Sequence, residues 1–136
     1  MMRAMLKGAA ALAAAALPLA SPQAANNHQA EYDADLSCAA YHLEIAGFYK
    51  SDLGRDNPRS DELIEQYRLK GTAKLGEALK HGAALGKDLE AVKTEMLTLI
   101  QSRIAGNLKE GSEAGLILAH VKDTTLKADT CQRSGN

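Results

Sequence analysis

Two cysteines, Cys38 and Cys131, constrain the fold of this chain more than any other feature. They lie near opposite ends of the region that follows an N-terminal apolar run. In an oxidising compartment such a pair forms one disulfide, whereas in a reducing one the two thiols stay separate. A bond between them would close most of the remaining chain into one loop and stabilise the fold by about 4–5 kcal/mol. Whether Cys38 and Cys131 are bonded therefore depends on the compartment in which the protein resides.

The first 24 residues predict export. Residues 1–7 carry Arg3 and Lys7 without an acidic residue, and residues 8–20 are uncharged, apolar and followed by small residues. This order is typical of a secretory signal peptide, and the run is shorter than the roughly 20 residues of a membrane-spanning helix. We therefore predict a cleaved signal peptide over residues 1–24, and a periplasmic or secreted protein in which Cys38 and Cys131 are bonded. No stable membrane anchor is expected after cleavage, because acidic residues separate Cys38 from the apolar run, unlike a lipid-acceptor cysteine.

The remainder of the chain has the composition of a helical protein. Aromatic residues make up 4% of the 136 residues and Trp is absent, while Ala, Leu, Lys and Glu are plentiful; these residues favour helices over strands. The length allows one domain. We predict a flexible segment over 25–34 and a helical domain over 35–133. Its four helices are expected over about 35–50, 58–85, 88–105 and 112–131.

Short loops between the helices favour antiparallel neighbours. The sequence therefore predicts an all-α fold, an antiparallel up-down-up-down four-helix bundle closed by one disulfide. In that order the start of the first helix and the end of the fourth lie at the same end of the bundle. Cys38 in the first turn and Cys131 in the last turn would then meet.

The helix over 58–85 carries glycines on its apolar stripe. Gly71, Ala78 and Gly82 share the core-facing side, although each glycine inside a helix costs about 1 kcal/mol relative to Ala. Their position predicts that a neighbouring helix approaches closely there.

The first helix is apolar on two faces, which is typical of a helix buried on both. One face contains Cys38 and is expected to turn toward the fourth helix. The other is left without a partner in a four-helix domain, and we predict that it binds a protein partner or a second copy of the chain. This predicted partner-binding stripe consists of Leu36, Ala39, Ala40, Leu43 and Gly47.

Catalytic and nucleic-acid-binding roles are not expected. Both cysteines are predicted to be bonded, and no Gly-x-Ser-x-Gly nucleophile motif or phosphate-binding loop occurs. The formal net charge is -1 and becomes more negative when Arg3 and Lys7 are removed. A chain without a basic stripe is a poor nucleic-acid binder. The sequence therefore predicts a protein that is not an enzyme.

No metal or cofactor is predicted either. His28 falls in the predicted flexible segment, and His42, His81 and His120 fall on three different helices. At about 1.5 Å per residue, these three would lie at different heights in the bundle and would not meet around one ion. The Cys-x-x-Cys-His motif of covalent haem and the Glu-x-x-His motif of di-iron bundles are absent.

The function predicted from these patterns is that of a non-enzymatic, exported (periplasmic) helical interaction protein. In size and class the chain is similar to acid-stress chaperones and toxin-neutralising immunity proteins, which implies a chaperone-like or inhibitor-like role. The alternative is a small-molecule or haem carrier that uses the bundle interior beside Gly71, Ala78 and Gly82.

Overall fold

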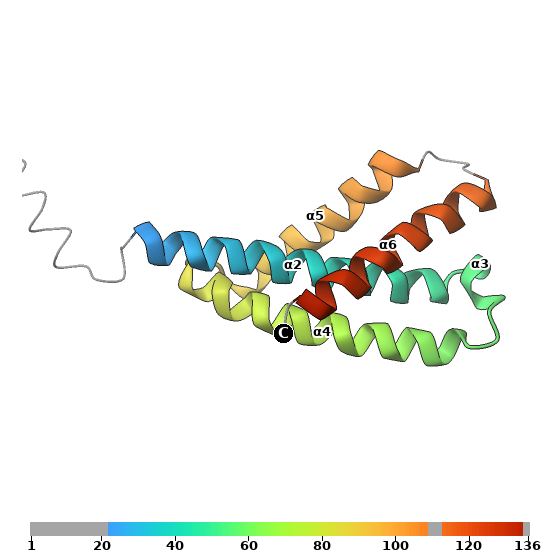
Figure 1. The fold of residues 1–136 in the computed structure, drawn as a ribbon, viewed down its shortest axis with the longest axis horizontal. Helices are drawn as coiled ribbons and strands as arrows, with labels where there is room; N and C mark the ends of the chain where they lie inside the picture. Colours follow the sequence, from blue (N-terminus) through green and yellow to red (C-terminus); the bar gives the residue numbers. More distant parts are fainter. Residues whose placement is uncertain (1–21, 109–112, 135–136) are drawn as a thin grey trace, which may run out of the picture.

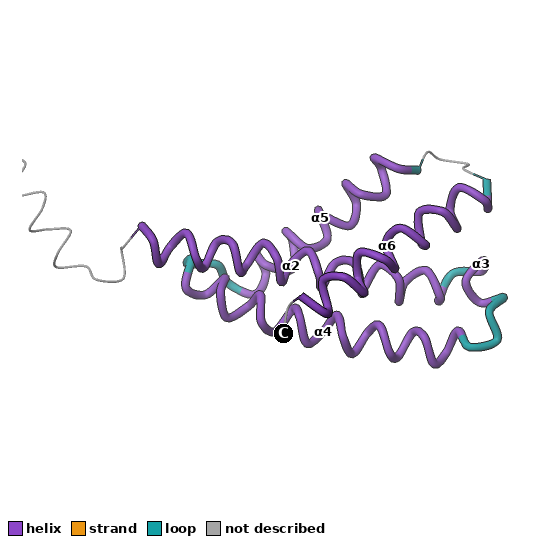
Figure 2. Tube along the Cα trace, viewed as in Figure 1, coloured by secondary structure: helices purple, strands orange, loops and turns teal. Residues whose placement is uncertain are grey.

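The computed structural model describes residues 22–108 and 113–134, and within these ranges it contains helices and no strand. The prediction of an all-α fold is therefore confirmed (Figures 1 and 2). Residues 1–21 of the predicted signal peptide and the start of the predicted helix over 112–131, at residue 112, lie outside the described residues. The helices are α2 (Pro22–Lys50), α3 (Asp52–Arg55), α4 (Ser60–Ala84), α5 (Leu89–Asn107) and α6 (Ala114–Ser134). None of them is both long and apolar enough to cross a membrane.

Helix α2 is the centre of the molecule. Helix α4 runs antiparallel along it and forms the largest interface, while α5 and α6 each pack mainly on α2 (Figure 1). Helices α5 and α6 scarcely contact each other. The predicted up-down-up-down four-helix bundle is therefore not confirmed, because the helices are arranged around one central helix rather than as four equivalent sides.

The glycines of α4 allow the close approach that the sequence predicted. A Cβ atom on Gly71 would lie 2.7 Å from Cγ of Leu43, and one on Gly82 would lie 3.0 Å from Cγ2 of Val92. Ala78, between them, is completely buried. The space beside these three residues is thus filled by neighbouring side chains.

The N-terminal part of α2 replaces the flexible segment that was predicted over 25–34. The helix begins at Pro22 rather than near Asp35. Tyr32 is only 1% exposed, packs beside Gly82, and donates a hydrogen bond from its hydroxyl to Oε1 of Glu95 at 2.9 Å. Packing against α4 and α5, both distant in sequence, therefore stabilises a helical conformation in a segment for which the local sequence pattern did not predict a helix.

The predicted partner-binding stripe on α2 is mostly core. Leu36, Ala39 and Ala40 are buried in one cluster with residues of α4 and α5, and Leu43 packs against that cluster; of the five, only Gly47 is exposed. The prediction of a free surface here is corrected, because α4 and α5 cover this face while α6 covers the face that contains Cys38. Helix α2 is buried on both sides by its own chain.

A tight turn places α5 against the N-terminal half of α2. Gly86 has a φ of 82°, a conformation that favours glycine, and the amide of Lys87 donates to the carbonyl of Gly82 at 2.8 Å. The Asp88 carboxylate then accepts a hydrogen bond from the amide of Ala91 at 2.8 Å. Asp88 is therefore the N-cap of α5, and the helix begins close to the predicted start at residue 88.

Candidate functional site

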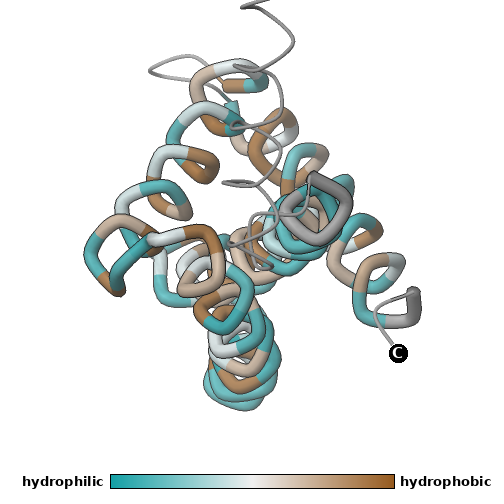
Figure 3. Tube along the Cα trace, turned by 90° about the vertical axis from the view of Figure 1, so that its left-hand side faces the viewer, coloured by the Kyte–Doolittle hydropathy of each residue, from teal (hydrophilic) through white to brown (hydrophobic). Residues whose placement is uncertain are grey.

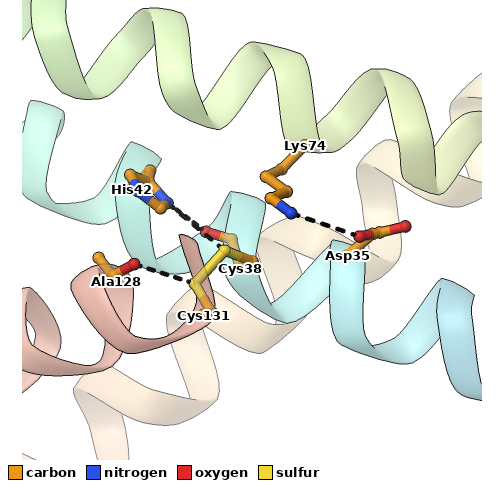
Figure 4. The surroundings of a disulfide bond; sticks show 6 residues. All are labelled: Asp35, Cys38, His42, Lys74, Ala128 and Cys131. Carbon is orange, nitrogen blue, oxygen red and sulfur yellow. Dashed lines mark hydrogen bonds and ion pairs between the residues drawn. A yellow bond between two sulfur atoms is a disulfide. The ribbon is translucent and has the colours of Figure 1, made fainter. Parts of the chain in front are cut away.

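The disulfide between Cys38 and Cys131 is present, with the two Cα atoms 5.7 Å apart. The predicted pairing is therefore confirmed. Its position differs from the prediction, because Cys38 lies in the middle of the longer α2 rather than in its first turn. The bond joins the C-terminal end of α6 to the middle of the central helix (Figure 4).

His42 lies beside the disulfide, one helical turn after Cys38. Its Nδ1–H donates to the carbonyl oxygen of Cys38 at 2.8 Å, and the ring is 1% exposed. Burial lowers the pKa of His42 from its ordinary value, against the smaller opposing effect of that hydrogen bond. The imidazole is therefore neutral and carries its proton on Nδ1, so it serves as a packing group around the disulfide.

An apolar groove lies between α6, α5 and the C-terminal half of α2. Its volume is about 550 Å³, within the range of ligand-binding clefts. The groove exists because α5 and α6 pack on α2 without packing on each other. Its apolar lining includes Leu43, Phe48, Ile100, Ile104, Ile117 and Val121. We refer to this feature as the α5–α6 groove.

The polar side chains of Glu44, His120 and Thr124 line the same groove. Arg103 of α5 hydrogen-bonds to two of them, and we call the four residues the Glu44 cluster. The Glu44 carboxylate accepts a hydrogen bond from Nε2 of His120 at 2.6 Å and one from the Thr124 hydroxyl at 3.1 Å. Arg103 donates to the same carboxylate at 3.4 Å and to Oγ1 of Thr124 at 2.6 Å. The cluster therefore connects α2, α5 and α6 through buried, mutually paired side chains.

The Glu44 cluster has one polar atom without a partner. His120 is only 7% exposed. Its Nδ1 is buried and makes no hydrogen bond to any residue that the structure describes. A buried unpaired nitrogen is costly. The Glu44 carboxylate is already paired with His120, Thr124 and Arg103, so Nδ1 of His120 is the atom of the cluster that could bind a polar group of a ligand.

Sequence analysis did not find this cluster. Glu44, Arg103 and His120 lie on three different helices and far apart in the chain, so no local motif connects them. The available signal was a polar residue on an apolar face: Thr124 lies on the core side of α6 and is completely buried.

Helices α5 and α6 carry large aliphatic side chains in contact with solvent, and apolar residues occur along the outer helices as well as at the centre of the molecule (Figure 3). A second hollow of about 610 Å³ flanks α6 on its other side, beside Phe48 and Leu53. Of the exposed aliphatic residues of the two helices, Ile104 lines the α5–α6 groove and the others lie outside it: Leu89, Leu97, Leu99, Leu116, Leu118 and Leu126.

Two groups of side chains have the composition of a metal site. Cys38, His42 and Cys131 form one, but their sulfur atoms are bonded to each other. Glu31, Asp35 and His81 form the other, at the opposite half of α2 from the groove.

Comparisons with protein-family models, with curated proteins and with solved structures found no match to this chain.

Proposed function

We propose that this is a non-enzymatic, exported protein that binds an amphipathic helix of a partner protein in the α5–α6 groove. The observation that carries the proposal is an apolar groove between two splayed helices, lined by the exposed Ile104, on a pair of helices that carry further exposed leucines. Exposed apolar surface of this extent in a small domain is typical of an interaction site, and helix-in-groove binding is a common mode of protein recognition.

The arrangement of α5 and α6 favours a helix over other occupants. Both helices pack on α2 and leave a space between themselves. A helix placed there would contact α2, α5 and α6 at once and would cover aliphatic side chains of both rims, such as Ile104 of α5 and Ile117 of α6. A small ligand on the groove floor would leave those rim side chains in water.

Export is supported by the charged, apolar and small-residue order of residues 1–24 and by the disulfide, since disulfides persist in oxidising compartments. The absence of an activated nucleophile from the Glu44 cluster supports a binding role. A periplasmic protein that covers an apolar helix of another chain would act as a chaperone or an inhibitor of that chain.

The test is capture of partners from periplasmic extract by wild type and by charge variants. Ile104→Glu places a carboxylate in the groove, at a side chain that is already 39% exposed, so the fold should survive. The matched control is Leu69→Glu on α4, where Leu69 is 55% exposed and lies outside the groove. We expect a protein that wild type and the control capture and that Ile104→Glu loses by at least tenfold. Equal capture by all three would contradict the proposal, and circular dichroism would verify that each variant is folded.

A small-molecule carrier is the second candidate, now placed in the groove rather than in the bundle interior. It is supported by the groove volume and by the polar Glu44 cluster on its wall, a combination typical of ligand sites. Native mass spectrometry separates the two functions: a carrier should retain a small molecule after purification, whereas a helix-binding protein should be empty. Light scattering of the same sample identifies a second copy of the chain as the occupant.

A further inference from the structure

A second group of polar side chains lies between the N-terminal half of α2 and the C-terminal half of α4, away from the groove. We call it the His81 cluster: His28, Glu31 and Asp35 from α2, with Lys74 and His81 from α4. Within it, one carboxylate oxygen each of Glu31 and Asp35 and one ring nitrogen of His81 all lie within 4.8 Å of one another.

Asp35 is the least satisfied member of the cluster. Its side chain is only 15% exposed, yet its closest cationic groups are Nζ of Lys74, 3.9 Å from Oδ1, and Nε2 of His81, 3.9 Å from Oδ2. Neither oxygen makes a hydrogen bond to a residue in the described ranges at ordinary length. Burial raises the pKa of Asp35, and Lys74 and His81 oppose that rise only in part. The Lys74 side of this arrangement is visible in Figure 4.

Asp35 and His81 are partly buried, and each is oriented by a neighbouring side chain. Nδ1 of His81 lies 3.1 Å from Nδ1 of His28, so one proton shared between these nitrogens holds the His81 ring and leaves its Nε2 toward Asp35. Lys74 holds the other oxygen of Asp35. Outer partners that orient a histidine and a carboxylate in this way accompany ligands in metal sites.

We propose that Glu31, Asp35 and His81 bind one divalent transition-metal ion of the Zn²⁺ class. Imidazole nitrogen and carboxylate oxygens are ligands of Zn²⁺ at about 2.0–2.2 Å, and such atoms lie about 3.4 Å apart around a tetrahedral ion. The three ligand atoms must therefore approach one another by about 1 Å to reach this spacing. Rotation of the exposed Glu31 side chain can achieve this. Two carboxylates balance the charge of the ion, and water occupies the fourth position.

The site departs from the sequence prediction that the chain binds no metal. His28 was assigned to a flexible segment, so its place beside His81 could not be foreseen. The helix that begins at Pro22 brings His28, Glu31 and Asp35 onto one face, because residues three, four and seven positions apart lie on the same side of a helix.

Calorimetric titration with ZnCl2 of the full chain, untagged and with its disulfide intact, tests the proposal. We expect one ion per chain for wild type. Glu31→Gln and His81→Gln should each weaken binding at least tenfold, and His28→Ala should weaken it about tenfold through the loss of an orienting partner. The matched control is Glu77→Gln, which removes a nearby charge that acts on Asp35 but no ligand, and it should bind within about threefold of wild type.

Ring-nitrogen NMR provides the second measurement, because Zn²⁺ should shift the Nε2 signal of His81. Failure of wild type to bind Zn²⁺ would overturn the proposal, and so would equal binding by wild type and Glu31→Gln. Glu31 is exposed, so that variant decides the question even if His81→Gln unfolds. The outcome is independent of the α5–α6 groove, since no member of the His81 cluster lines it.

Discussion

Gly71 and Gly76 both lie within α4, and their surroundings are opposite. A Cβ on Gly71 would meet the Leu43 side chain at 2.7 Å, whereas one on Gly76 would meet nothing within 4 Å. We expect Gly71→Ala to lower the free energy of unfolding by about 1–3 kcal/mol, because it overpacks the α2–α4 interface. Gly76→Ala should raise it by up to about 1 kcal/mol, because Ala favours helix. Urea unfolding of both variants measures the difference, and equal effects would contradict the close approach.

His42 gives the protein a pH-dependent stability. Burial lowers its pKa below the ordinary value of 6.5, so the unfolded chain takes up a proton at a pH where the folded chain does not. Stability is therefore full above about pH 6.5 and falls as the pH drops below it, by up to about 1.4 kcal/mol per unit from this residue. The charged groups that act on the ring are Lys70, Lys74 and Asp129.

The variant His42→Asn isolates this effect, because its amide can still donate toward the carbonyl of Cys38. We expect wild type to lose more stability than His42→Asn between about pH 7 and pH 5.5, measured by urea unfolding at each pH. Parallel losses in the two proteins would show that the folded state protonates His42 as readily as the unfolded state does.

At the scale of elements, the N-terminal part of α2 depends on Tyr32. We expect residues 26–34 to show protected amides in hydrogen exchange. Tyr32→Ala should remove that protection and cost about 3–5 kcal/mol, as aromatic-to-Ala changes in a core do. Tyr32→Phe keeps the packing and loses only the hydrogen bond to Glu95, so it should cost about 1 kcal/mol. Rapid exchange of 26–34 in wild type would show that this segment is flexible after all.

The start of α2 and the helices that follow it differ in how well the sequence predicts them. The helix ending near residue 85, the helix starting near residue 88 and the close approach at Gly71 were predicted, because each is indicated by a local sequence pattern. The start of α2 was not, since it depends on Tyr32 packing beside Gly82 and binding Glu95. The Glu44 cluster was missed for the same reason: its members meet only after α2, α5 and α6 have packed.

At the scale of the whole molecule, the disulfide closes a loop across a sequence separation of 93. Helix α6 packs mainly on α2, and the bond fixes its C-terminal end to that helix. We expect Cys38→Ser with Cys131→Ser to lower the free energy of unfolding by about 4–5 kcal/mol. Exchange should increase first in residues 114–134, while α4 keeps its protection. Uniform loss of protection would contradict the view that α6 is held separately.

The position of the disulfide also has a mechanical consequence. The bond pins α6 near its last turn, while the groove-lining Ile117 lies near its first, about 20 Å away along the helix axis at 1.5 Å per residue. A helix that tilts about one end moves most at its other end. A tilt of about 10° at the disulfide displaces the N-terminal end of α6 by about 3–4 Å. A tilt of α6 about the disulfide would therefore displace its groove-lining N-terminal end most. The Glu44 cluster lies between that end and the disulfide, and its hydrogen bonds hold α6 against α2.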